Sequence, residues 1–354
     1  MTRFAKRYGI VFLAVKIVLV AVFYKNSFFP RCENCDRVVI EGFMNLNGDD
    51  IFRFRSRKTD SKFINRYTNL VENGCYKPKN CDSTEILSIL IPYRNRPEQL
   101  DELLVYLHSF LINQQRHYCI YVIEQSIEKA FNRGALLNIG FNISQKSDCY
   151  ITHDVDLIPI DPRNLYSCYS KSAVRMSSRI DKLSFSDPMK AERGFYISAG
   201  GVVSFTREQL LFTNGFSNDY WGWAPEDQDM ARRVRDFDFQ DDSFYGKNFS
   251  GPSFNGLKFN EHNFNGHYSG SEKWRNEYFS KFMTVDQHNG GRGLVRNSKF
   301  GFYKSLDFYA GGDGPDKVPR KLDYVGKKNG LNSVVFKILG IKKLKLMTLV
   351  KVEF

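Results

Sequence analysis

The sequence lacks a basic stripe, an alternating aromatic and basic repeat, and any internal repeat. Lys and Arg number 51 against 39 Asp and Glu, for a formal net charge of +12, but the basic residues are spread over the whole chain. Nucleic-acid surfaces concentrate their charge on one face, so we expect no nucleic-acid partner. The composition, 42% hydrophobic and 25% charged, is that of a globular protein and excludes collagen-like, coiled-coil and disordered classes.

The cysteines are too few and too irregular for a zinc module. Cys32 and Cys35 form one CxxC pair, and no second CxxC or histidine pair follows at ligand spacing. We expect this pair to serve as a disulfide or as a free thiol. Seven cysteines are an odd number, so at least one has no partner within the chain.

The N-terminus carries an apolar run without a small-x-small cleavage site after it. Residues 9–24 are apolar apart from Lys16, and basic residues precede them. At about 1.5 Å per residue the run spans roughly 24 Å, short of the ~30 Å hydrocarbon core, so flanking residues must help. We predict a cytoplasmic tail at 1–8 and a transmembrane signal-anchor at 9–24, with the rest lumenal in a single-pass type II arrangement. A cleaved signal peptide is the alternative.

The rest of the chain divides into a stem and one catalytic domain. Residues 25–84 mix charge, Asn and Gly without periodicity, which is typical of a stem. From 85 to 354 apolar strands alternate with helical stretches, a pattern that predicts an α/β domain with ligands at the carboxyl ends of the strands. The expected strands are 86–93, 118–125, 148–160, 196–206 and 343–354, and the expected helices are 100–115, 131–143 and 207–216.

Acidic residues follow the third of these strands. Asp154 and Asp156 are separated by one residue, and side chains of a strand alternate with period two, so we expect both carboxylates on the same side. Two carboxylates there suit a divalent ion, which would neutralise a nucleotide diphosphate as it leaves. The alternative is a solvated surface pair.

A second acidic cluster lies beside two of the three tryptophans. Trp221 and Trp223 flank a glycine and precede Glu226, Asp227 and Asp229. Tryptophan faces stack on a sugar, and a carboxylate can act as the base for its hydroxyl. The structural alternative is a buried tryptophan beneath a helix whose first turn contains the acids.

Arginines follow the first two strands. Arg94, Arg96 and Arg133 can bind phosphate or contact a nucleoside, and Tyr93 or Phe131 could stack on the base. Surface salt bridges are the alternative. The Gly200–Gly201 pair permits close approach of a ligand to the backbone, although such a pair also marks bulges and turns.

Taken in this order, the motifs IPYRNR, FNRGALLNIGF, DVDLIP, AGGV and WGWAPEDQD resemble those of the β-1,4-galactosyltransferase family of type II Golgi enzymes. The resemblance runs from about Cys75 to the C-terminus. It implies a GT-A fold with a mixed, mostly parallel central sheet, location in the Golgi membrane, and an inverting, Mn²⁺-dependent reaction. The donor would be UDP-Gal or UDP-GalNAc, and the acceptor a terminal sugar on a glycoprotein or glycolipid, joined in β-1,4 linkage.

The resemblance also implies roles for individual residues. Asp227 would be the general base, with Glu226 helping to bind substrate, and Asp156 and His267 would bind the metal, with His262 as the alternative histidine. Cys149 and Cys168 would form a disulfide, whereas Cys81 could pair with Cys75, Cys35 or Cys32. The donor-binding residues would be Pro92, Tyr93, Arg94, Arg96, Phe131, Arg133, Asp154, Val155, Trp223 and Gly201, and the acceptor-binding residues Trp223, Glu226, Asp227 and Gln228.

Several positions depart from the family pattern. Gln228 replaces an acid, Ala224–Pro225 replaces two glycines, and Phe264 stands where relatives often have a methionine ligand. Ser198 is smaller than the tyrosine common in galactosyltransferases and leaves room for an N-acetyl group, so it is the candidate for donor specificity. Two alternatives stay open: a catalytically weakened member acting as a sugar-binding or chaperone-like subunit, and a xylose-directed proteoglycan galactosyltransferase.

Overall fold

The computed structural model describes only part of the chain. The described residues are 33–34, 67, 69–83, 85–126, 129–144, 147–168, 173–181, 198–222, 225–235, 284–285, 295–296, 302–305 and 329–354. Within these ranges no helix is both long enough and apolar enough to cross a bilayer. The predicted anchor at 9–24 and most of the predicted stem lie outside them, as do Trp223, His262, Phe264 and His267.

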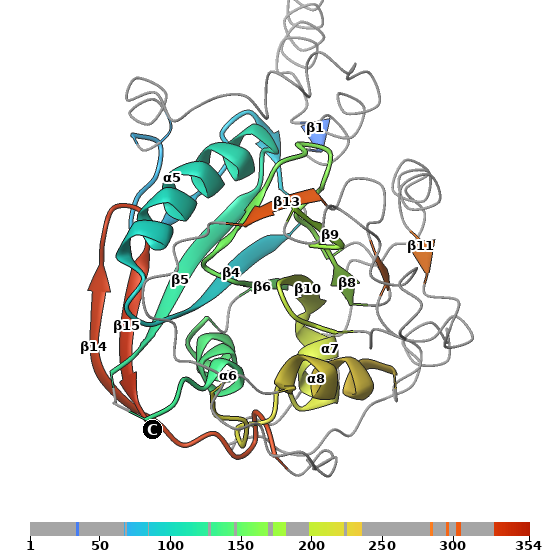
Figure 1. Cartoon of the computed structure of the whole chain (residues 1–354). Helices are drawn as coiled ribbons and strands as arrows, with labels where there is room; N and C mark the ends of the chain where they lie inside the picture. The colour runs from blue at the N-terminus through green and yellow to red at the C-terminus, as the bar shows by residue number, and fades with distance from the viewer. Residues whose placement is uncertain are drawn as a thin grey trace, which may run out of the picture.

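A large mixed sheet forms the centre of the fold (Figure 1). Its strands follow the order β11-β12-β8-β10-β6-β4-β5-β15-β14. The short strand β2 pairs with the beginning of β5. The bounds are β2 Cys75–Tyr76, β4 Ile86–Tyr93, β5 His117–Gln125, β6 Cys149–His153, β8 Val174–Arg175, β10 Val202–Thr206, β11 Thr284–Val285, β12 Val295–Arg296, β14 Lys337–Lys343 and β15 Thr348–Glu353. Two small sheets contain β1 Glu33–Asn34 with β3 Cys81–Asp82, and β7 Leu157–Pro159 with β9 Arg179–Ile180 and β13 Phe302–Ser305.

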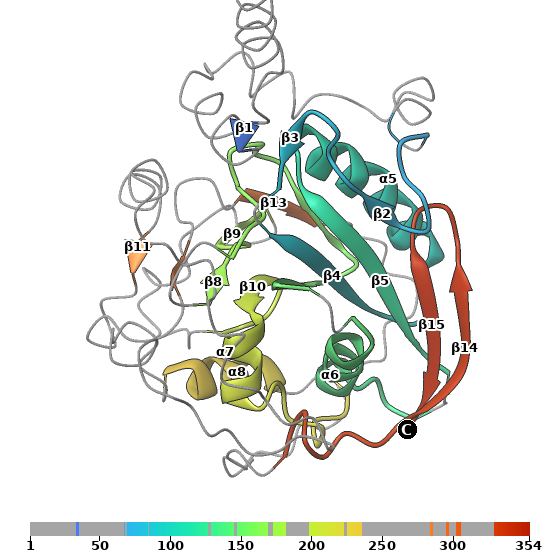
Figure 2. The same cartoon turned by 180° about the vertical axis from the view of Figure 1, so that it is seen from behind.

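Helices cover both faces of the sheet, as Figures 1 and 2 show. Leu87 and Ile89 of β4 pack in one hydrophobic core with α5, whereas Leu90 of the same strand packs in a second core with α6. This alternation is what a strand buried on both faces requires, and it explains the continuous apolar run of β4. The helices are α5 Pro97–Asn113, α6 Arg133–Ile143, α7 Arg207–Thr213 and α8 Glu226–Arg235.

The sequence predicted the central elements well and the outer ones less well. The expected strand at 86–93 and the helix at 131–143 are confirmed as β4 and α6. The expectation of a mostly parallel sheet holds only for the centre, where β6, β4, β5 and β15 are parallel, while β10, β14 and β2 are antiparallel to their neighbours. The predicted strand at 343–354 is β15 alone, because a turn at Leu344–Met347 separates it from β14.

The segment before β4 is fastened to the sheet. Cys75 forms a disulfide with Cys119 of β5, which the sequence did not predict. Gly74 has a φ of +78°, and a Cβ there would lie 2.6 Å from the Cα of Met347. Residues 69–83, placed in the predicted stem, therefore pack on the folded domain. Cys81 is also disulfide-bonded, and because Cys75 is bonded to Cys119, the expected pairing of Cys81 with Cys75 was wrong; the other two expected partners, Cys32 and Cys35, lie outside the described residues.

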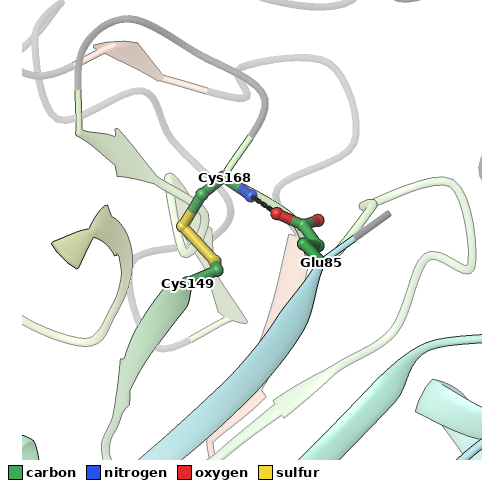
Figure 3. A group of neighbouring side chains, drawn as sticks. All are labelled: Glu85, Cys149 and Cys168. Atoms are coloured by element: carbon green, nitrogen blue, oxygen red, sulfur yellow. Dashed lines mark hydrogen bonds between the residues drawn. A yellow bond between two sulfur atoms is a disulfide. The ribbon is translucent and has the colours of Figure 1, made fainter. Parts of the chain in front are cut away.

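The predicted disulfide between Cys149 and Cys168 is confirmed (Figure 3). A Glu85 carboxylate oxygen accepts a hydrogen bond from the Cys168 backbone N–H at 3.1 Å. Ligand atoms of these three residues lie within 4.8 Å of one another. They cannot form a metal site while the two sulfurs are joined, because a disulfide has no thiolate to offer.

We expect the two disulfides to contribute unequally to stability. The Cys149–Cys168 bridge closes a sequence separation of 19 and the Cys75–Cys119 bridge one of 44. Each bridge lowers the entropy of the unfolded chain by closing a loop. We therefore expect the Cys149–Cys168 bridge to raise the free energy of unfolding by about 3 kcal/mol and the Cys75–Cys119 bridge by about 4 kcal/mol. Denaturant unfolding of the two Cys→Ala double variants would measure both values. Equal stability of wild type and either variant would contradict the expectation.

Candidate functional site

The site lies at the carboxyl edge of the central parallel strands. β4 ends at Tyr93, β5 ends at Gln125, and β6 ends at His153 just before Asp154. The buried side chain of Asn132 caps α6 by accepting a hydrogen bond from the Ala135 N–H at 2.9 Å, so the helix starts with Arg133 at this edge. Parallel strands bring residues that follow them to one edge of the sheet, as the sequence predicted.

Asp154 and Asp156 do not continue the strand. They occupy the turn between β6 and β7, here called the aspartate turn, so the expectation that strand alternation aligns their carboxylates was wrong. Each carboxylate instead has its own arginine. Asp154 pairs with Arg133 at 2.7 Å, and Asp156 pairs with the exposed Arg96 at 3.3 Å. Asp156 keeps 32% of its side chain exposed, so its oxygens are accessible from solvent.

Arg133 is the central cation of the site. Its Nε donates to Asp154 Oδ1, and its Nη1 lies 3.8 Å from Glu226 Oε1. Burial alone would lower the pKa of Arg133, but Asp154 and Glu226 outweigh it and raise that pKa. Neither terminal nitrogen has a hydrogen-bond partner among the described residues, although both are buried. Buried donors are nearly always satisfied, so these two indicate a place for an anionic ligand.

Glu226 begins α8 and has a strongly shifted pKa. Burial raises it to about 7, with Asp227 adding to the effect and the Arg133 guanidinium opposing it. The carboxyl is therefore protonated in part of the molecules at neutral pH. A partly protonated carboxyl can donate a hydrogen bond to a substrate oxygen as well as accept one.

We expect this shift to make stability depend on pH. Between the ordinary value of 4.5 and about 7 the folded chain holds the Glu226 proton and the unfolded chain releases it, so the unfolding free energy falls as pH rises. The fall amounts to roughly 3 kcal/mol at about 1.4 kcal/mol per pKa unit. Glu226→Gln should abolish it, as measured by denaturant unfolding at pH 4.5 and pH 8. The exposed Glu98→Gln is the matched control, and an equal pH slope in both variants would contradict the assignment.

Asp227 is held in place through both of its carboxylate oxygens. Oδ2 accepts a hydrogen bond from the Ser198 hydroxyl, and Oδ1 accepts one from the Gln228 N–H at 2.7 Å. A Cβ at Gly200 would lie 2.7 Å from Oδ2, so only glycine leaves this carboxylate where it is. Ser198 thus contacts the predicted base directly, a contact that sequence reasoning did not foresee.

Gly201 connects the strand β10 to the aspartate turn. Its N–H donates to Asp154 Oδ2 at 3.1 Å, and its carbonyl accepts from the Asp154 N–H at 3.2 Å. Its φ is +75°, and a Cβ would lie 2.3 Å from Ser177 Oγ. Gly201 therefore allows β10 and the aspartate turn to pack closely against each other.

The other predicted donor-binding residues fall into buried and accessible groups. Pro92 in β4 and Val155 in the aspartate turn are both buried. Arg94 lies over the Phe131 ring at 5.4 Å and donates to the Lys129 carbonyl at 2.6 Å. Tyr93 is half-buried at the end of β4, and burial raises the pKa of its hydroxyl. The structure thus brings the predicted tyrosine, arginine and phenylalanine to one edge.

Sequence reasoning missed one aromatic contact beside the acidic cluster. The Trp221 ring packs against Phe354 with centroids 5.5 Å apart, and Lys129 lies 5.6 Å from the Trp221 ring centroid. No local pattern relates positions so distant in the chain. Trp223 and His267 lie outside the described residues, so their predicted roles stay predictions.

Comparison with known families gives two adjacent matches. Residues 40–169 match the N-terminal region of glycosyl transferase group 7, and residues 182–244 match the N-terminal domain of galactosyltransferase. Both matches include residues of the site just described. The first contains Arg133 and the aspartate turn, and the second contains Ser198, Glu226 and Asp227.

Similar proteins match about half of the chain. β-1,4-Galactosyltransferase 1 of Mus musculus is 45% identical over 165 residues, which are 46% of this chain and 39% of that protein. β-1,4-Galactosyltransferase 4 of Mus musculus is 38% identical over 208 residues, 58% of this chain and 57% of that protein. The matched region thus spans less than two thirds of either relative.

Crystal structures of Drosophila β-1,4-galactosyltransferase 7 share the fold. The complex with xylobiose has a TM-score of 0.53 and 22% identity, and covers 76% of this chain and 94% of that one. A complex of a mutant of the same protein with manganese, UDP-Gal and xylobiose has a TM-score of 0.50. The likeness establishes a GT-A-like glycosyltransferase fold with a mixed sheet.

Proposed function

Because the chain belongs to the glycosyl transferase group 7 family of β-1,4-galactosyltransferases, we propose that it transfers a hexose from a UDP-sugar to a terminal sugar. The reaction inverts the anomeric carbon and forms a β-1,4 linkage. One observation carries the proposal: the buried Arg133 guanidinium has two terminal nitrogens without hydrogen-bond partners among the described residues. It stands beside two acids at the carboxyl edge of the sheet.

A diphosphate fits the donors of this edge. Phosphate oxygens accept hydrogen bonds from a planar guanidinium in pairs, which would satisfy both terminal nitrogens of Arg133. Arg94 and Arg96 follow the neighbouring strand β4 and add positive charge. Tyr93 and Phe131 offer ring faces to the uracil.

We propose Mn²⁺ as the metal, as in the manganese complex of the Drosophila relative. Asp156 fits this ion because its carboxylate is a hard oxygen ligand, is 32% exposed, and follows the strand that ends at the site. His267 would be the second ligand. When bound, the metal would neutralise charge on the leaving diphosphate.

Asp227 acts as the general base in this proposal. Its carboxylate removes the proton of the acceptor hydroxyl while that oxygen attacks the anomeric carbon from the face opposite UDP. The bond from the anomeric carbon to the diphosphate oxygen breaks, and its electron pair leaves with UDP. Glu226, whose pKa of about 7 leaves it partly protonated, hydrogen-bonds a substrate hydroxyl. Gln228 and Trp223 would complete the acceptor side.

The choice of sugars is a finer part of the proposal. UDP-Gal is the first candidate donor, and UDP-GalNAc is the second because Ser198 is small and lies at the Asp227 carboxylate. The acceptor is a GlcNAc-type terminal sugar or, alternatively, xylose on a proteoglycan. We further propose that residues 9–24 anchor the enzyme in the Golgi membrane with its catalytic domain in the lumen.

Release of UDP by the purified full-length protein tests both the class and the donor. The assay would combine Mn²⁺ with UDP-Gal, UDP-GalNAc, UDP-Glc or UDP-GlcNAc, and with N-acetylglucosamine or a xyloside as acceptor. We expect release that depends on acceptor and Mn²⁺ with UDP-Gal or UDP-GalNAc. If the protein uses both donors, Ser198→Tyr should lower UDP release from UDP-GalNAc relative to release from UDP-Gal.

Two outcomes would contradict the proposed activity. The first is absence of release with every donor and acceptor despite Mn²⁺-dependent binding of UDP, which would favour a sugar-binding or chaperone-like subunit. The second is release that does not change when Mn²⁺ is replaced by a chelator, which would remove the metal from the proposal.

A further inference from the structure

A cavity lies away from the candidate active site. It measures about 810 Å³ and is open to solvent. Its floor contains Tyr121 of β5, Val350 of β15 and Ile341 of β14, and its edge contains Ile143 at the end of α6. This volume lies within the range of about 300 to 1,000 Å³ that small-molecule sites occupy.

The cavity is remote from the donor site along the sheet. His117 at the start of β5 and Tyr121 in its middle line the cavity, whereas the site residues follow the other end of that strand at Gln125. At about 3.3 Å per residue the four positions from Tyr121 to Gln125 span roughly 13 Å. A ligand in the cavity can therefore bind while UDP occupies the active site.

Lysines border the cavity on two walls. Lys77 and Lys79 follow β2 on one side, and Lys343 ends β14 on the other. All three are exposed, so their side chains are accessible to a ligand. Glu72 is the one carboxylate among the lining residues, which leaves an excess of positive charge. Because burial and Lys77 lower the pKa of His117, that ring adds no charge at neutral pH.

The walls are fixed before any ligand arrives. The Cys75–Cys119 disulfide ties the β2 wall to β5, and the Gly74 N–H donates to the Lys345 carbonyl at 2.9 Å. The Thr348 hydroxyl donates to the Asn73 carbonyl at 3.2 Å, which joins the two walls directly. A preformed cavity avoids the ordering cost that a flexible surface would pay on binding.

We propose that this cavity binds an anionic oligosaccharide, one that carries sulfate or carboxylate groups on its rings. The Tyr121 ring and the aliphatic side chains suit the C–H faces of sugar rings, and the lysines that follow β2 and end β14 suit negative groups along the oligosaccharide.

Calorimetric titration of the full-length protein with a sulfated, uronate-containing tetrasaccharide tests the proposal. At about 150 mM salt we expect at least ten-fold tighter binding of this probe than of its desulfated counterpart. The variant Lys77→Gln/Lys79→Gln/Lys343→Gln should weaken binding at least ten-fold. Its matched control, Lys304→Gln/Lys337→Gln/Lys342→Gln, loses the same charge from exposed positions that do not line the cavity and should stay within two-fold.

Several outcomes would overturn the cavity assignment. If both triple variants bound the tetrasaccharide equally weakly, binding would depend only on net charge. If saturating UDP displaced the tetrasaccharide, the probe would occupy the donor site. Tighter binding of an acidic peptide or of anionic vesicles would replace the oligosaccharide with another partner. The titration contains no donor and no metal, so its result is independent of whether transfer occurs, and UDP release should be unchanged in the lysine variants.

Discussion

The Asp227→Asn variant is expected to lose about three orders of magnitude in kcat for acceptor-dependent UDP release. General base catalysis contributes about 10² to 10⁴ in rate, and the amide cannot take a proton from the acceptor hydroxyl. Asparagine can still accept the hydrogen bond from Ser198 through its oxygen, although its amide nitrogen cannot accept the one from the Gln228 N–H, so the side chain keeps one of its two contacts at the start of α8. The variant should therefore bind UDP with unchanged affinity in the presence of Mn²⁺.

The exposed Asp219→Asn is the matched control for this substitution, since it makes the same chemical change a few residues earlier. Its kcat should stay within two-fold of wild type. Unchanged turnover of Asp227→Asn would remove Asp227 from the role of base. Loss of UDP binding together with turnover would instead assign the residue to the donor site.

Replacement of Arg133 is expected to affect both stability and donor binding. Arg133→Met leaves Asp154 and Glu226 without their shared buried cation, and breaking such a pair costs about 3 to 5 kcal/mol. Arg133→Lys keeps the charge but loses the planar fork, so it should fold and yet bind UDP at least ten-fold more weakly. Denaturant unfolding and UDP titration separate the two effects.

A similar arginine outside the site provides the control for this pair of variants. Arg163 pairs with the buried Asp161 at 2.7 Å, away from the carboxyl edge. Arg163→Lys should leave UDP affinity unchanged. If Arg133→Lys also binds UDP as wild type does, the terminal guanidinium nitrogens of Arg133 do not serve the diphosphate.

The sequence predicted the parts of the fold whose signal is local. β4 was predicted at its observed bounds because a continuous apolar run stands between polar segments. A helix was predicted over 131–143 from its helical sequence pattern, and the structure adds that Asn132 caps it directly before Arg133. The same local signals brought Tyr93, Phe131 and Arg133 to the edge where the acids lie.

The sequence could not predict contacts between residues far apart in the chain. It also could not predict turns that lack the residues typical of turns. The turn between β14 and β15 is closed by a hydrogen bond from the Leu344 N–H to the Met347 carbonyl at 2.8 Å, and it contains no Gly, Pro, Asn or Asp. The Cys75–Cys119 pairing is one of many that seven cysteines allow.

The separate arginine partners of the aspartate turn were also beyond the sequence. Alternation along a strand gives no information once the chain leaves the strand, and Asp154 and Asp156 both follow the end of β6. The burial of Arg133 between Asp154 and Glu226 depends on α8, which comes far later in the chain. Such contacts are visible only after the elements are assembled.

The position of β15 inside the sheet has a consequence for biosynthesis. This strand pairs in parallel with β5, yet Ser126 and its partner Val352 are 226 positions apart. At about 5 to 20 residues per second, a ribosome needs roughly 10 to 45 s to extend the nascent chain from one to the other. For that time the part of β5 from Tyr121 to Gln125 lacks its β15 partner, so completion of the sheet follows translation of residues 348–353, and chaperones have an exposed apolar strand to protect.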